Sequence, residues 1–64
     1  MTPQTARVFL MIASNRFWEA RERDVRAISE LLELDFIKPA RQGKLRGYVL
    51  APAGYRHWLG HQQR

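Results

Sequence analysis

The hydrophobic residues near the start of the chain recur at the spacing of an amphipathic helix. Ile12 follows Val8 by four positions and Phe9 by three. Residues at these spacings share one face of a helix. Thr2-Pro3 supplies a preferred N-cap residue followed by a proline, which suits the first helical position. The pattern therefore predicts a helix over roughly Pro3–Ser14.

A second amphipathic segment gives the clearest helical pattern in the chain. Asp24 is a suitable N-cap residue for it. The apolar positions that follow recur mainly at intervals of three and four and form one stripe: Val25, Ile28, Leu31, Leu32 and Phe36. This pattern predicts a second helix whose apolar stripe packs into the core.

The segment between these two predicted helices is short. Acidic and basic residues stand four apart in it, in the order that stabilises a helix: Glu19 with Arg23, and Glu22 with Arg26. Helical spacing can therefore begin as early as Trp18. We expect a separate helix here to be absent or reduced to a single turn around Phe17–Arg21.

Alternation of apolar and polar residues replaces helical spacing after the second helix. Phe36-Ile37 begins a strand in which Pro39 cannot donate a ladder hydrogen bond, which favours the edge of a sheet. Gln42-Gly43 predicts a turn in which the glycine is free to adopt positive φ, and Leu45–Leu50 forms the returning strand. The period of two assigns the faces of that strand: Tyr48 and Leu50 towards the core, Leu45 and Val49 away from it.

A short helix is predicted at the C-terminal end. Pro52 suits its first turn, Tyr55, Trp58 and Leu59 share one face, and Gly60 is expected to end it. The fold class is therefore α+β, in one domain over residues 1–64, with two helices, a two-stranded hairpin and a short C-terminal helix.

Size and composition narrow the class of protein further. A chain of 64 residues buries only about 60% of its unfolded surface, and without cysteine it has no disulfide or thiolate metal site to stabilise it. Self-association as a homodimer is therefore expected. The longest unbroken apolar run, Val8–Ala13, has six residues, which is shorter than a membrane span or a signal-peptide core. A soluble cytoplasmic protein without membrane contact is predicted.

Charge is distributed unevenly along the chain. The net charge is +5, from 11 Lys and Arg against 6 Asp and Glu. All six acids lie within residues 19–35, and residues 36–64 carry +6 with no acid. This asymmetry suggests that the basic half contacts a polyanion. The competing interpretation is a solubilising surface, because +5 is ordinary for a small domain.

Two short motifs resemble transcriptional regulators of the MarR and PadR families. Leu31–Lys38 resembles the "L-x-x-x-G-L-I-x" passage from recognition helix to wing, and Leu50–Arg56 resembles the "L-T-P-A-G-x-x" that follows the wing. The basic, glycine-containing hairpin between them has a fitting length. The resemblance covers roughly residues 24–56 and implies a compact winged helix, similar to those of small phage- and plasmid-borne proteins.

The chain departs from the family pattern at three places. Asp35 stands where the families have glycine, so an aspartate is expected in a left-handed or bridge conformation. Ala51 replaces the threonine that would cap the last helix, a loss of about 1 kcal/mol. The supporting helix of the winged-helix fold has no room between the first two predicted helices and is expected to be reduced or absent.

The resemblance implies duplex DNA as the partner and a role as a transcriptional regulator or DNA-architecture accessory. A winged helix places one helix in the major groove, and its hairpin wing reaches phosphates. The wing residues available for phosphate contacts are Lys38, Arg41, Gln42, Lys44 and Arg46. The candidates for base readout are Arg23, Arg26 and Ser29, with Arg26 best placed to contact guanine. The alternative is that both arginines only neutralise Glu19 and Glu22.

Glu30 and Glu33 favour a different partner. Phosphates repel carboxylates, although glutamate can accept a hydrogen bond from cytosine. A protein-binding winged helix, acting as an adaptor or inhibitor of a larger regulator, polymerase or nuclease, would use these two acids with exposed aromatic residues: Phe17, Trp18 and Trp58. For the two tryptophans, packing in the core or in a dimer competes with partner binding, because a small domain needs large apolar anchors.

No chemistry of catalysis or cofactor binding is indicated. The serines, acids and histidines form no triad spacing, no glycine-rich phosphate loop is present, and so short a chain has little room for a deep pocket. His57 and His61 are four apart, but no carboxylate or third ligand lies near them in the sequence. We therefore predict neither an enzyme, nor a metal site, nor a cofactor.

Overall fold

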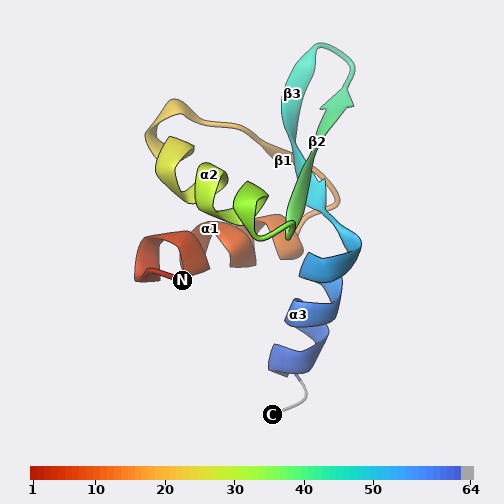
Figure 1. Ribbon diagram of the computed structural model, residues 1–64. Coiled ribbons are helices and arrows are strands. Elements are labelled where there is room, and N and C mark those ends of the chain that lie inside the picture. The colour runs from red at the N-terminus through yellow and green to blue at the C-terminus, as the bar shows by residue number, and fades with distance from the viewer. Residues whose placement is uncertain (63–64) are drawn as a thin grey trace.

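The computed structural model describes residues 1–62, and the side chains of residues 1–60. Its elements follow in this order: α1 (Pro3–Ala13), β1 (Trp18–Glu19), a 3-10 turn η1 (Glu22–Asp24), α2 (Val25–Glu33), β2 (Ile37–Gln42), β3 (Leu45–Leu50) and α3 (Pro52–Gln62). The strands form one antiparallel sheet in the order β1-β3-β2. Figure 1 shows α1 and α2 packed together, the hairpin rising from them and α3 extending in another direction. The predicted α+β class, with a hairpin between helices, is confirmed.

Helix α1 begins as its sequence predicts. The Thr2 hydroxyl oxygen accepts a hydrogen bond from the Thr5 backbone N–H at 3.2 Å, and Pro3 occupies the first turn. Val8, Phe9 and Ile12 are buried on its inner face. The side chain thus satisfies one of the backbone donors that a helix N-terminus leaves free.

The segment between α1 and α2 differs from the prediction. Residues 17–21 contain the short strand β1, in which Trp18 pairs with Tyr48 and Glu19 with Gly47 of β3. The single helical turn comes later, at η1. The helical pairing of Glu19 with Arg23 is therefore wrong, because Glu19 lies on a strand. The reduction of this region to less than a full helix is confirmed.

Helix α2 buries a narrower face than its apolar stripe indicated. Ala27, Ile28 and Leu31 are buried, whereas Val25 is 56% and Leu32 is 37% exposed. The predicted stripe was wrong at Val25 and at Leu32 because these two residues lie on the edge of α2 that borders an open groove.

Asp24 precedes α2 but does not cap it. Its side chain makes no capping hydrogen bond. It is instead buried, 5% exposed, and accepts a long hydrogen bond of 3.4 Å from the Gln4 side-chain amide of α1. Asp24 therefore occupies the predicted N-cap position, but the predicted capping hydrogen bond is absent. Its side chain instead connects α2 to α1.

The end of α2 has the hydrogen bonds of a Schellman motif. The Phe36 N–H donates to the Leu31 carbonyl and the Asp35 N–H to the Leu32 carbonyl, both at 3.0 Å. This closure requires a left-handed residue, and Asp35 adopts it with φ of 60°. The prediction of an unusual conformation at Asp35 is confirmed.

The hairpin has the predicted strands and turn. Gln42 pairs with Leu45 across a two-residue turn, in which Gly43 has φ of 62°. Strand β2 forms one edge of the sheet, so that Pro39 is tolerated there. Tyr48 and Leu50 pack against the core as predicted.

Helix α3 is attached to the body through its first two turns. Gly54 is buried against the backbone of Phe36, and the His57 ring stacks on the Phe36 ring with centroids 4.7 Å apart. The helix continues through Gly60 to Gln62, so the predicted end at Gly60 is wrong. A glycine costs a helix only about 1 kcal/mol, which is too little to stop it here.

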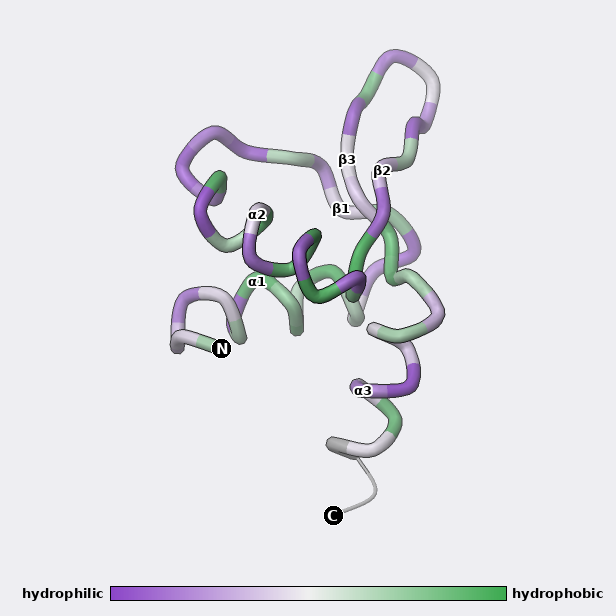
Figure 2. Tube along the Cα trace, viewed as in Figure 1, coloured by the Kyte–Doolittle hydropathy of each residue, from purple (hydrophilic) through white to green (hydrophobic). Residues whose placement is uncertain are grey.

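The core lies where α1, α2 and the base of the sheet meet. It consists of eight buried apolar residues: Val8, Phe9, Ile12, Trp18, Ala27, Ile28, Leu31 and Ile37. Figure 2 shows that the far end of the hairpin is mainly hydrophilic, in contrast to the inner parts of the helices. In the described part of the chain, no helix is both long and apolar enough to cross a membrane.

Candidate nucleic-acid interface

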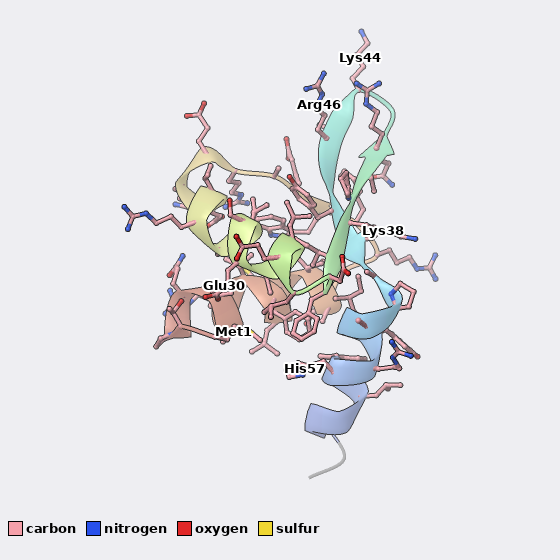
Figure 3. The ribbon with its side chains drawn as sticks, in the orientation of Figure 1. Met1, Glu30, Lys38, Lys44, Arg46 and His57 are labelled. Carbon is pink, nitrogen blue, oxygen red and sulfur yellow. The ribbon has the colours of Figure 1, made fainter. Side chains whose placement is uncertain are left out.

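The far half of the hairpin extends beyond the core and carries three cations. Arg41, Lys44 and Arg46 are all exposed. Figure 3 shows Lys44 at the tip and Arg46 beside it on β3, with Lys38 lower on β2. No acid follows Asp35 in the chain, so that no carboxylate of the hairpin offsets these charges.

Strand register divides the predicted phosphate contacts between two faces. Arg41 pairs directly with Arg46, and Pro39 with Tyr48, so these four side chains share the face that packs on the helices further down. Lys38 and Gln42 are each an odd number of residues from Pro39 and Arg41, so their side chains lie on the opposite face of the hairpin. The structure therefore brings Arg41 and Arg46 together and separates them from Lys38 and Gln42, with Lys44 at the turn between the faces.

The Arg41–Arg46 pair is unfavourable for the isolated hairpin. Like charges directly opposite one another on a sheet face are destabilising, and these two residues are paired at the exposed end of the ladder. An anion placed between the two guanidinium groups would turn this repulsion into two charge-assisted hydrogen bonds.

Helix α2 presents its own polar face next to the hairpin. Arg26, Ser29 and Glu33 are exposed, and Arg23 is exposed on η1 just before the helix. Of the two acids that could neutralise these arginines, Glu19 lies on β1 and Glu22 on η1.

A groove that the sequence did not predict runs between α2 and the sheet. It has a volume of about 340 Å³. Its lining residues are Ala20, Arg21, Glu22, Val25, Ile28, Ser29, Leu32 and Tyr48. A second hollow, which contains Arg41 and Arg46, shares Ala20 and Tyr48 with the first. The groove beside Ser29 of α2 and the hollow with the paired arginines therefore adjoin at Ala20 and Tyr48.

Sequence reasoning missed this groove because it depends on β1. That strand has two residues, which is too short to produce a periodic signal. By pairing with β3 it brings Ala20 close to Tyr48, and the two residues line both hollows. The exposure of Val25 and Leu32 follows from the same arrangement.

The residues predicted for a protein partner do not form one surface. Trp18 is 7% exposed and belongs to the core, so its side chain is not available for docking. Phe17 is half-buried and lies against Gly47, where a Cβ would come within 2.7 Å of its ring. Trp58 packs against the core from α3, and Glu33 is exposed on α2.

Glu30 differs from Glu33 in its surroundings. It is half-buried, and its Oε2 atom is buried without a hydrogen-bond partner in the described structure. Neither acid lines the groove between α2 and the sheet.

Metal binding has no support from the described residues, because no group of three or more His, Asp or Glu side chains lies close enough together to hold an ion there. His57 instead packs on aromatic rings, with its centroid 5.6 Å from that of Phe9. The side chain of His61 lies outside the described part of the chain.

No known protein family, curated protein or solved structure matches this chain. The resemblance to the MarR and PadR families therefore rests on the motifs at residues 31–38 and 50–56 alone.

Proposed function

We propose that this chain is a compact winged-helix protein that binds duplex DNA. The observation that carries the proposal is the Arg41–Arg46 pair, placed directly opposite on one face of the hairpin with no acid on either strand. Such a pair is costly without an anion and favourable with one. The phosphates of DNA supply anions at regular spacing.

The roles of the elements follow from their positions. Helix α2 enters the major groove with Arg26 and Ser29 towards the base edges, and Arg23 contacts the backbone or a base at its start. The hairpin is the wing. Arg41, Lys44 and Arg46 contact phosphates on the α2 side and at the tip, and Lys38 and Gln42 contact phosphates only where the DNA wraps around the other face.

The proposed biological role is transcriptional regulation or organisation of DNA by a homodimer. Tyr55 and Leu59 of α3 are 52% and 36% exposed on a helix that extends from the body, and a second copy covers them in this proposal. Two copies would double the number of phosphate contacts and place two α2 helices on neighbouring half-sites.

Fluorescence anisotropy with labelled duplexes across a range of salt concentrations tests DNA binding. If four to six cations each neutralise a phosphate, log K falls linearly with log salt with a slope of about −4 to −5 per chain. Failure to bind any duplex at ~50 mM salt, where this electrostatic contribution is large, would contradict the proposal.

A second candidate function is an adaptor that binds a protein. Val25, Leu32 and Leu34 leave apolar surface exposed around α2, and Glu33 adds a carboxylate beside it. In this case Glu33→Lys abolishes partner binding and hairpin substitutions have little effect. The cationic hairpin has no role in this alternative, and DNA binding is therefore the better-supported function.

A further inference from the structure

Val25 occupies an unusual position for an aliphatic residue. It is the first residue of α2 and is 56% exposed, more than any other large hydrophobic side chain among residues 1–60. Exposure of this kind at a helix N-terminus does not help the fold, because the side chain gains little from burial.

The surroundings of Val25 combine apolar and cationic groups. Val25 lines the groove between α2 and the sheet together with Leu32 and Tyr48, and Arg21 lines the same groove. Arg26 is exposed on the next position of the helix. Glu22 also lines the groove and offsets the charge of Arg21, so that Arg26 is the cation that favours an anionic polymer with apolar groups.

Duplex DNA is an anionic polymer of this kind, and its apolar groups are exposed in the major groove. The only such group is the 5-methyl group of thymine, which proteins contact with small apolar side chains. In helix-turn-helix proteins, residues near the N-terminus of the recognition helix contact base edges, and Val25 has that position on α2. An apolar protein partner would leave Arg26 without an anion unless it also carried acids.

We infer that Val25 reads the 5-methyl group of a thymine adjacent to the base pair contacted by Arg26. This inference rests on the proposed function and specifies the ligand: a duplex that presents thymine beside guanine in the major groove. Glu22, which lines the same groove, can accept a hydrogen bond from a neighbouring cytosine amine.

Replacing thymine by deoxyuridine tests the inference, because it removes only the methyl group. The probe is the duplex that the wild-type chain selects from a random library at ~50 mM salt, with each thymine replaced in turn. At the contacted position the affinity of the wild-type chain should fall about fourfold, which is the effect of burying one methyl group. The other positions should show no change.

Two variants at the same position connect this effect to Val25. Val25→Ser, which has no methyl group, should bind the thymine and deoxyuridine duplexes equally. Val25→Thr should keep most of the discrimination because it retains a methyl group. Both changes are at an exposed site, and circular dichroism should show an unchanged fold.

The possible failures are distinguishable. If the wild-type chain binds the selected duplex but no deoxyuridine substitution lowers its affinity, the inference is wrong and the proposed DNA binding stands. If Val25→Ser still prefers thymine, a different residue reads the methyl group and the inference is also wrong. If no duplex is bound at all, the proposed function fails, and the inference with it; selection of an acidic peptide by the same groove would then favour the adaptor function.

Discussion

Gly54 and Gly60 lie on the same helix but in opposite surroundings. A Cβ on Gly54 would lie 2.7 Å from the carbonyl carbon of Phe36 and closer still to its oxygen, whereas one on Gly60 would meet nothing within 4 Å. Phe36 is held in place, because its carbonyl accepts from the Ala51 N–H at 2.9 Å and its N–H donates to Leu31. Glycine at position 54 therefore allows α3 to pack on the backbone that leaves α2.

Exchanging each glycine for alanine separates packing from helix propensity. Gly54→Ala should lower the free energy of unfolding by about 1–3 kcal/mol, the usual cost of overpacking. Gly60→Ala is the matched control and should raise it by up to about 1 kcal/mol, because alanine favours the helix. Urea denaturation measures both changes, and equal effects of the two substitutions would contradict this assignment.

Asp35 is a second residue whose conformation predicts the effect of substitution. Its φ of 60° is strained for most residues and unstrained for glycine. Asp35→Gly should therefore raise the free energy of unfolding by about 0.5–1 kcal/mol. Asparagine also tolerates this conformation but has no charge. If Asp35→Asn raises the free energy of unfolding as much as Asp35→Gly does, the gain comes from removing the charge. Thermal or urea unfolding of the three chains decides between the two causes.

At the scale of elements, the spacing of apolar residues predicts the helices and strands that are long enough to contain several apolar positions in phase. Helix α1, the core of α2 and both hairpin strands have several apolar positions in phase, and local signals marked their ends: Thr2-Pro3, Asp35 and Gln42-Gly43. Strand β1 has only Trp18-Glu19 and is stabilised by pairing with β3, a contact between residues 28 or more positions apart. No local pattern contains that information.

The candidate interface was predictable in composition and not in arrangement. The cations of the hairpin were evident because no acid interrupts them, but which of them share a face depends on the register that pairs Arg41 with Arg46. The spacing of Val25 fits the apolar stripe and predicts that this residue lies in the core. Its exposure depends on where the sheet stands relative to α2, which the sequence pattern does not specify.

Reversing one charge of the hairpin separates stability from function. Arg41→Glu replaces a like-charge pair with an opposite-charge pair across from Arg46, so that the free energy of unfolding should rise by about 0.5 kcal/mol. DNA affinity should fall by roughly tenfold or more, because a charge-assisted contact is lost and a repulsion is added. The magnitude of the salt slope should fall by about 1.

Arg7→Glu is the matched control for that experiment. It changes the net charge by the same amount at an exposed position of α1, outside both the hairpin and the proposed dimer interface on α3. Its effect on affinity should be small. If both substitutions weaken binding equally, the hairpin acts only through the net charge of the molecule, and the assignment of Arg41 to a phosphate contact is wrong.

At the scale of the whole molecule, the chain separates its apolar core from its cationic end. The core gathers residues from α1, α2 and the base of the sheet, while the hairpin extends away from it with exposed cations (Figure 3). A domain this small has a stability of only a few kcal/mol. Helix α3 leaves Tyr55 and Leu59 exposed at the other end, where further burial is available.

The proposed homodimer predicts that stability depends on concentration. If the folded chain associates through α3, mass action should raise the thermal unfolding midpoint by several degrees for each tenfold increase in chain concentration. Tyr55→Glu places a carboxylate in that interface and should remove the dependence. Leu45→Glu makes a similar change at a hairpin residue that is 45% exposed and should leave it intact. A midpoint of the wild-type chain that does not vary with concentration, together with a monomer mass in sedimentation equilibrium, would contradict the dimer and leave DNA binding to single chains.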